Sequence, residues 1–324
     1  MTKLLWSALA ICAVWLGVTP SVAAQQYPSK PLRLIVPFPA GGGSDVVGRI
    51  VAKKLSERLG QQVVIDNKGG AGGSIGTGEA VRAAPDGYTM VLASTSEIAV
   101  NPALYSKLGY DTAKDLTAVA MVASTPIVIV ANPTLPIKNV GELIQFAKAK
   151  PGTLNVASAG NGSFTHLSGE LFRSLAGLTW THVPYKGAAP AMTDLVAGQV
   201  QLMFSALPAA MPFIKNSQLS AIAVSTSNRS PALPEVPTVS SSGLPAYEVV
   251  FWYGIFVPSA TPREVVDRLA DEIAQTLKSS DVVDSLAAQG AEPGSMTSAK
   301  FSAFVSDEVQ KWGKVVKSSG AKVD

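Results

Sequence analysis

Short apolar runs alternate with helical patterns along most of the chain. The apolar runs predict strands at residues 32–37, 63–66, 88–93, 127–131, 154–158, 179–183, 200–204 and 219–224. Apolar positions at helix spacing predict helices at residues 46–59, 140–149, 164–175 and 191–197. Alternation of this kind favours mostly parallel sheets with crossover helices, so an α/β fold is expected.

The C-terminal part of the chain has a different pattern. It predicts three successive helices, at residues 263–277, 282–288 and 299–316, with little strand between them. Two apolar segments, at residues 120–133 and 247–262, each read as a strand that ends at a proline-containing turn. They mark the places where the chain is expected to pass from one domain to the other.

Two crossings would divide the chain into a discontinuous domain 1, residues 25–125 plus 246–324, and a domain 2, residues 126–245. A ligand cleft would then lie between the domains, with the two crossing strands as its hinge. The alternative is two sequential domains joined by one linker. No Ser/Gly-rich linker is visible, which favours two crossings.

The first 24 residues read as a secretory signal peptide rather than as part of the fold. Lys3 precedes an apolar stretch at residues 4–18, and Val22-Ala23-Ala24 provides small residues for cleavage after Ala24. A membrane anchor is the alternative, but it needs about 20 apolar residues. Cleavage would remove Cys12, the only cysteine, and would place the mature chain in the periplasm.

Composition excludes several classes of function. The 324 residues carry 26 Lys and Arg against 23 Asp and Glu, a formal charge of +3, and the basic residues are scattered. This is no footprint of a nucleic-acid-binding protein. One cysteine and two histidines, with no acidic or histidine group at metal-ligand spacing, predict neither a metal centre nor a cofactor.

Glycine-rich loops that precede helices carry the most functional information. The loop at residues 37–45 joins the first strand to the first helix, and Ser44 is expected to cap that helix. A helix start offers unpaired N–H groups and partial positive charge, which suit a carboxylate or a phosphate. No Lys-Ser/Thr follows the glycines, so this is not a nucleotide-binding P-loop.

A second loop of this type, at residues 158–163, precedes the helix that carries His166. A third turn, at residues 183–190, adds the hydroxyl of Tyr185 and lies ahead of Asp194. Two helix starts that face each other across a cleft, one from each domain, would suit a small molecule with two acidic ends.

The glycine cluster at residues 69–78 contains a literal G-x-S-x-G match centred on Ser74. The alternative function is therefore an exported serine hydrolase that uses Ser74 with His166 or His182 as base. Such an elbow needs a strand that runs straight into the turn, whereas several residues separate Ser74 from the strand ending near Asp66. His166 is better explained as a helix-start histidine bonded to backbone, and His182 as structural.

A series of motifs over the whole mature chain matches one known pattern. They are residues 37–42 with Asp45, 70–73 with Ile75-Gly76, Asn101-Pro102 with Leu104-Tyr105, 183–187, Ala191 with Asp194-Leu195, 198–200, 229–238, 252–254, and Pro258 with Thr261-Pro262. In number and order they resemble the TctC-type substrate-binding proteins, the extracytoplasmic receptors of tripartite tricarboxylate transporters, also called the Bug family.

The resemblance implies a type II periplasmic binding protein fold, with two α/β domains joined by two crossing strands, and it implies no catalysis. In this family the ligand carboxylate lies against the loop after the first strand and the glycine loop of the middle domain, partly through ordered waters. The ligand-binding residues that it implies are Phe38, Gly42, Gly43, Ser44 and Asp45; Gly160, Asn161, Gly162 and Ser163; Ser94, Thr95 and Ser96; and Tyr185, Gly187 and Asp194.

Two positions depart from the family. Gly43-Ser44 stands where relatives often have a small residue and Thr, and Ser44 is expected to preserve the cap. Ser205-Ala206 stands where acidic or amide residues are frequent, which leaves selectivity open. Backbone amides and hydroxyls can hold a carboxylate without a fixed cation, so Lys186 is given no ligand role.

The implied partners are a small carboxylate, either a di- or tricarboxylate or an aromatic acid, and an integral-membrane permease that runs on an ion gradient. A monomer suits a protein that shuttles between solute and permease. A receptor whose main output is a membrane sensor kinase is a further alternative. Which acid binds is left open by the sequence.

Overall fold

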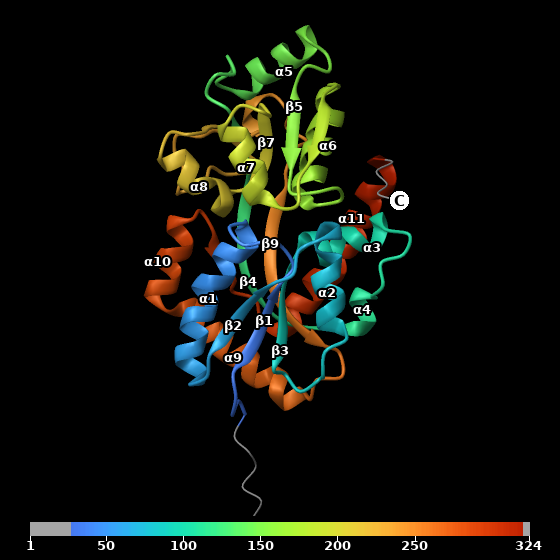
Figure 1. The fold of residues 1–324 in the computed structure, drawn as a ribbon, viewed down its shortest axis with the longest axis vertical. Helices are drawn as coiled ribbons and strands as arrows, with labels where there is room; N and C mark the ends of the chain where they lie inside the picture. Colours follow the sequence, from blue (N-terminus) through green and yellow to red (C-terminus); the bar gives the residue numbers. More distant parts are fainter. Residues whose placement is uncertain (1–26, 320–324) are drawn as a thin grey trace, which may run out of the picture.

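The computed structural model of the protein describes residues 27–319 (Figure 1). The expected signal peptide and its cleavage site lie outside the described residues. The strands form a continuous path in the order β2-β1-β3-β9-β4-β7-β5-β6. Their bounds are β1 (Leu32–Val36), β2 (Val63–Asn67), β3 (Thr89–Ser94), β4 (Leu116–Ala131), β5 (Asn155–Ser158), β6 (Thr181–Pro184), β7 (Leu202–Ala206) and β9 (Val250–Pro258).

Pairing within this path is parallel in some places and antiparallel in others. The parallel pairs are β1–β2, β1–β3, β5–β6 and β5–β7. The helices predicted at residues 46–59 and 164–175 connect β1 to β2 and β5 to β6. Every pair that includes β4 or β9 is antiparallel, including the pairs that β4 makes with β8 (Ser220–Val224) and β10 (Glu292–Pro293). The sheets are therefore less parallel than the alternation predicts, because the crossing strands lie inside them.

The long strand β4 belongs to both halves of the molecule. Leu116 to Pro126 pairs with β9, and Ile127 to Ala131 pairs with β7 and β8. Its alternating side chains also enter two different cores, with Ile127 and Ile129 in one and Val128 and Val130 in the other. The strand begins four residues before the predicted segment, and the domain limits at residues 126 and 245 stay a prediction.

Helices divide into two groups along the long axis of the molecule, as Figure 1 shows. The terminal domain, defined here by β1–β3, β9, β10 and the first part of β4, carries α1 (Gly43–Leu59), α2 (Ser74–Val81), α3 (Asn101–Leu104), α4 (Thr112–Asp115), α9 (Arg263–Lys278), α10 (Ser280–Ala288) and α11 (Ser298–Ser319). The middle domain, defined by β5–β8, carries α5 (Val140–Ala149), α6 (Phe164–Ala176), α7 (Ala188–Val196) and α8 (Leu207–Lys215).

Several helical segments, among them the short α3 and α4, are absent from the prediction. Helix α2 has the sequence SIGTGEAV, in which two glycines hide any apolar period. Helix α8 contains Pro208 and Pro212, which signal a helix break rather than a helix. A π-helix at Ser96–Val100 runs directly into α3 and follows β3 without a turn signal.

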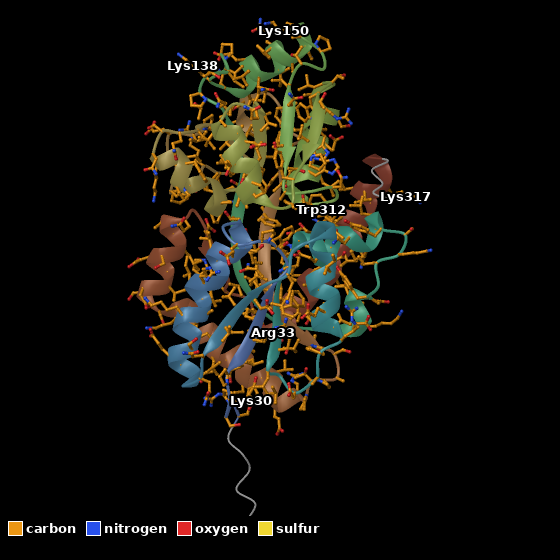
Figure 2. The ribbon with its side chains drawn as sticks, viewed as in Figure 1. Lys30, Arg33, Lys138, Lys150, Trp312 and Lys317 are labelled. Carbon is orange, nitrogen blue, oxygen red and sulfur yellow. The ribbon has the colours of Figure 1, made fainter. Side chains whose placement is uncertain are left out.

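The C-terminal helix α11 is hydrogen-bonded to strand β9. Glu308 of α11 accepts hydrogen bonds from the indole N–H groups of Trp252, at 3.0 Å, and Trp312, at 3.1 Å. Figure 2 shows Trp312 near the middle of the long axis, whereas Lys138 and Lys150 lie at one end and Lys30 at the other. Helix α11 therefore supports the hinge region rather than one domain alone.

Candidate ligand-binding site

A small cavity, the inner cavity, lies where the two domains meet. Its volume is about 30 Å³, enough for about two water molecules. Residues of both domains line it: Phe38, Gly42, Gly43, Ser44, Ser96, Phe251 and Tyr253 from the terminal domain and its crossing strand, and Ala159, Ser163, Phe164, Thr165, Ala188, Ser205, Ala206 and Ala209 from the middle domain.

On the terminal side the cavity is formed by the start of helix α1. Gly42 is the N-cap residue with an extended backbone, and no side chain caps this end. Ser44 is the second residue inside the helix and not its cap, so the prediction that it caps α1 is wrong. The first N–H groups of a helix have no partner within it, and here they border the cavity.

Asp45 holds the loop ahead of α1 in place. Its carboxylate accepts hydrogen bonds from Gly41 N at 2.9 Å, Arg49 Nε at 2.9 Å and Asn67 Nδ2 at 3.1 Å. Burial alone would raise the pKa of Asp45, but these three hydrogen bonds outweigh it and the pKa lies below its usual value. Asp45 does not line the inner cavity, so it positions the loop that does.

On the middle-domain side, the start of helix α6 faces the cavity. Ser163 caps this helix, because its Oγ accepts from His166 N at 3.3 Å, and it also donates to the carbonyl of Gly160 at 2.7 Å. Phe164 N donates to Ser96 Oγ of the terminal domain at 3.0 Å. The two predicted helix starts therefore border one cavity, joined by a hydrogen bond between the domains.

Helices α7 and α8 also begin at this cavity, through Ala188 and through Ala206 with Ala209. None of the residues that line it is charged. A helix N-terminus carries partial positive charge and free N–H groups, so four of them create a favourable place for an anion. A lining of helix dipoles and hydroxyl groups is compatible with a negatively charged group.

A larger space, the outer cavity, adjoins the inner one and shares Phe38 and Ala159 with it. Its volume is about 710 Å³. It is lined by Phe38, Pro39, Asn67, Gly69, Gly70, Ala71, Gly72, Tyr105, Ala159, Gly160, Asn161, Pro184, Tyr185, Lys186 and Gly187. The shared residues show that the two cavities are neighbours.

The structure divides the predicted ligand-binding residues into three groups. Six line the inner cavity, namely Phe38, Gly42, Gly43, Ser44, Ser96 and Ser163. Phe38 also lines the outer cavity, together with Gly160, Asn161, Tyr185 and Gly187. Neither cavity is lined by Asp45, Ser94, Thr95, Gly162 or Asp194.

Hydrogen bonds account for the remaining members of that last group. Ser94 Oγ donates to Glu97 Oε2 at 2.5 Å, and Thr95 Oγ1 accepts from Trp252 N at 3.1 Å. Gly162 N donates to His166 Nδ1 at 3.2 Å. Asp194 accepts from the Tyr185 hydroxyl at 2.7 Å, which makes it a support for a residue of the outer cavity.

The loops of the two domains touch across the cleft, and glycines permit this contact. A Cβ atom on Gly187, whose φ is +113°, would lie 2.8 Å from Pro39 Cγ of the other domain. A Cβ on Gly41 would lie 3.4 Å from the Cβ of Ala189. The domains are therefore closed on each other in this structure.

Sequence reasoning missed several residues of the inner cavity, above all Tyr253. The sequence favours packing in the core or the hinge for Trp252 and Tyr253 over a ligand contact, and both are fully buried. The hydroxyl of Tyr253, however, has no hydrogen-bond partner among the residues that the structure describes. Ala209 was missed together with helix α8, and neither residue carried a signal of its own in the sequence.

The geometry around Ser74 does not fit the serine hydrolase alternative. Strand β2 ends at Asn67, and Ser74 begins helix α2 after a short 3₁₀ turn, so there is no strand-to-helix elbow. His166 accepts from the backbone, as expected, and stacks on His182 with ring centroids 3.9 Å apart. Within residues 27–319, no hydrogen bond joins Ser74 to either imidazole.

His182 shares a 2.7 Å hydrogen bond with Ser158 Oγ, and burial lowers its pKa to about 4. The histidine pair therefore stays neutral and supports the loop that precedes α6. Among the described residues, no group of three or more His, Cys, Asp or Glu side chains could hold a metal ion. Over the same part of the chain, every helix is too short or too polar to cross a bilayer.

Comparison with known proteins agrees with this architecture. Residues 47–321 match the family described as "Tripartite tricarboxylate transporter family receptor". BugT of Bordetella pertussis is 39% identical over 324 residues, which cover 100% of this chain and 99% of that protein.

Two solved structures are similar throughout. R. palustris Rpa4515 with adipate is 36% identical with a TM-score of 0.89, and the match covers 92% of this chain and 100% of that one. MatC (Rpa3494) from Rhodopseudomonas palustris with bound malate is 33% identical with a TM-score of 0.85, covering 90% and 100%.

Proposed function

Because the chain belongs to the family of tripartite tricarboxylate transporter receptors, which are substrate-binding proteins and not enzymes, we propose that it captures a small dicarboxylate between its two domains. We propose further that it works in the periplasm and delivers this acid to a membrane permease. The observation that carries the proposal is the inner cavity, which four helix starts border and no charged side chain lines.

One carboxylate of the ligand fits the inner cavity. Each hydrogen bond from an amide or a hydroxyl to a charged group is worth about 1.5–3 kcal/mol, so a few such bonds can replace a fixed cation. The free N–H groups at the start of α1 are the principal donors in this proposal, because no side chain caps that helix. Helix α6 is already capped by Ser163 and contributes mainly its dipole.

The remainder of the ligand lies in the outer cavity. The two similar structures are named with adipate and with malate, which differ in length but both carry two carboxylates. An inner cavity for one carboxylate and a larger outer cavity for the rest would accept acids of several lengths. Phe38, which lines both, would pack against the connecting carbons.

Calorimetric titration of the chain from residue 25 onward tests this function. The ligands are malate and the straight-chain diacids from malonate to adipate, with the diamide of adipate and a sugar as controls. At least one acid is expected to bind and to raise the melting temperature, and the diamide to bind at least about tenfold more weakly because charged acceptors make stronger bonds. The proposal would be refuted if the diamide bound as tightly as the acid, or if the sugar stabilised the protein and no acid did.

Delivery to a permease follows from closure, because only a ligand that prefers the closed state shifts the protein toward it. The permease can then distinguish loaded from empty receptor by shape. Uptake of the labelled acid by cells is expected to need this protein and an intact ion gradient. If uptake survives deletion of the gene while induction of other genes is lost, the protein acts as a sensor instead.

A further inference from the structure

One polar atom in the inner cavity has no role within the protein. Tyr253 lies on β9 and is fully buried, yet its hydroxyl has no hydrogen-bond partner among the described residues. A buried polar group without a partner costs about 1–3 kcal/mol, so such groups are rare in folded proteins. Tyr253 is also one of the residues that line the inner cavity, where a ligand could supply the missing partner.

The hydroxyl lies directly beside the uncapped start of helix α1. A Cβ atom on Gly43, the first residue of that helix, would be 2.5 Å from the Tyr253 oxygen and 3.1 Å from the Cβ of Ala206 in the middle domain. The phenol therefore occupies the junction of the helix start and both domains. A carboxylate bound at the free N–H groups of α1 would be within reach of this hydroxyl.

The protonation state of the Tyr253 phenol determines whether it donates or accepts a hydrogen bond. Burial and the nearby carboxyl of Glu97 both raise the pKa of Tyr253, so the phenol keeps its proton and can donate it. No hydrogen bond joins Tyr253 to Glu97 in the described structure, although Glu97 Oε1 also has no partner. A neutral donor beside an N-terminal helix end favours an anionic acceptor.

We infer that the Tyr253 hydroxyl donates a hydrogen bond to the ligand carboxylate and is a determinant of specificity for acids. This inference rests on the proposed function. It also places a ligand contact on the strand that pairs with the first part of β4, which continues into the middle domain. Ligand binding would thus act on the hinge directly.

A series of packed aromatic rings connects Tyr253 to both domains. The Tyr253 ring packs edge-on against Phe251 at 4.9 Å, Phe251 stacks on Phe164 of α6 at 4.8 Å, and Phe164 packs on Trp312 of α11 at 4.8 Å. These four rings link the crossing strand to one helix of each domain. Fixing the phenol by a ligand would favour the arrangement in which all four are packed.

The test compares two buried tyrosines. Tyr253→Phe removes the hydroxyl that has no partner, whereas the matched control Tyr247→Phe removes one that donates to the carbonyl of Ser168 at 3.1 Å, away from both cavities. Affinity is measured by calorimetry with whichever of malate and the straight-chain diacids binds the wild-type protein most tightly. Tyr253→Phe is expected to weaken binding about 10- to 100-fold, and Tyr247→Phe to leave it unchanged.

Melting temperatures without ligand provide a second readout. If the Tyr253 hydroxyl had a purely structural role, its removal would lower the melting temperature. Tyr253→Phe is expected to melt at or above the wild-type temperature, because it removes an unsatisfied group, whereas Tyr247→Phe loses a hydrogen bond and melts lower. Should Tyr253→Phe fail to melt cooperatively, the near-ultraviolet difference spectrum of the wild-type protein decides. Donation from a phenol to a carboxylate shifts tyrosine absorption to longer wavelength when the acid is added.

The possible outcomes separate this inference from the proposed function. Equal affinity of Tyr253→Phe and wild type for the acid, or no spectral shift, overturns the role of Tyr253 and leaves the receptor function standing. Loss of affinity with Tyr253→Phe alone supports it. If the wild-type protein binds no acid, the proposed function fails, and the inference fails with it.

Discussion

Glu97 is a buried carboxyl next to the binding site, and its protonation affects stability. Ser94 donates to its Oε2 from both N and Oγ, and no ion pair of Glu97 is found among the described residues. Burial raises the pKa of Glu97 from 4.5 to about 7. The folded protein therefore keeps this proton at pH values where the unfolded chain has lost it. The contribution of Glu97 is complete below about pH 4.5 and is lost as the pH rises through 7.

Glu97→Gln is expected to abolish this pH dependence. Its amide oxygen can keep the bonds from Ser94, and its NH₂ replaces an oxygen that has no partner. Urea unfolding at pH 4.5 and 8 should show that the variant gains about 3 kcal/mol relative to wild type between these pH values. The exposed control Glu235→Gln should show no such gain. No gain in Glu97→Gln, or an equal gain in the Glu235→Gln control, would contradict the raised pKa of Glu97.

Gly43 is required because the Tyr253 hydroxyl occupies the space that a side chain would need. Gly43→Ala places a Cβ 2.5 Å from that oxygen, and overpacking of this kind costs about 1–3 kcal/mol. In Gly43→Ala/Tyr253→Phe the nearest ring atom is 3.7 Å away and only the 3.1 Å contact with the Cβ of Ala206 stays tight, so the melting temperature should recover in part. Acid affinity should stay low in the double variant. A double variant that melts no higher than Gly43→Ala would show that another contact is responsible.

At the scale of elements, we expect closure to depend on the contact between the glycine loops. Gly187→Ala should weaken acid binding, because its Cβ would meet Pro39 of the other domain at 2.8 Å. Gly177→Ala is the matched control, since Gly177 ends α6 with φ +62° and nothing lies within 4 Å of an added Cβ. Both variants should lose about 0.5–1 kcal/mol or more of stability to backbone strain. Equal affinities in the two variants would exclude a role of this contact in closure.

The elements differ in how far they can be predicted from sequence. Helix α5 is predicted at its observed ends, 140–149, because its apolar period is regular and Asn139 caps it. Helix α8 is hidden by Pro208 and Pro212, which only tertiary packing makes compatible with a helix. The glycine turn that precedes the first helix can be recognised in the sequence, and the helix begins at Gly43. That Ser44 lies inside the helix and does not cap it cannot be predicted in this way.

The same limit applies to the site. Glycine loops identify the two helix starts, because their chemistry is local. Tyr253 cannot be recognised in this way, because both Trp252 and Tyr253 are buried and no polar alternation shows which of them faces a cavity. Only the folded structure, in which β9 lies between β3 and β4, shows that the Tyr253 hydroxyl has no hydrogen-bond partner among the described residues.

At the scale of the whole molecule, the domains should be closed when an acid is bound. Cysteines at Gly41 and Ala189 would test this, because their Cβ atoms would be 3.4 Å apart, near the separation of about 3.8 Å in disulfides. In Gly41→Cys/Ala189→Cys, built in the chain from residue 25, the cross-link should form faster when the bound acid is present. Non-reducing electrophoresis measures it, with each single variant as control. Equal rates with and without the acid would argue against ligand-driven closure.

The order of strands also bears on when the chain can fold. Strand β9 lies in the centre of the sheet path, between β3 and β4, although more than a hundred residues separate it from β4 in sequence. A nascent chain therefore lacks the strand that joins its first and second halves until residue 258 has been synthesised. Such long-range pairing folds slowly. A delay of this kind would keep the chain extended during synthesis, which is the form that a protein needs to be threaded through a membrane before it folds on the far side.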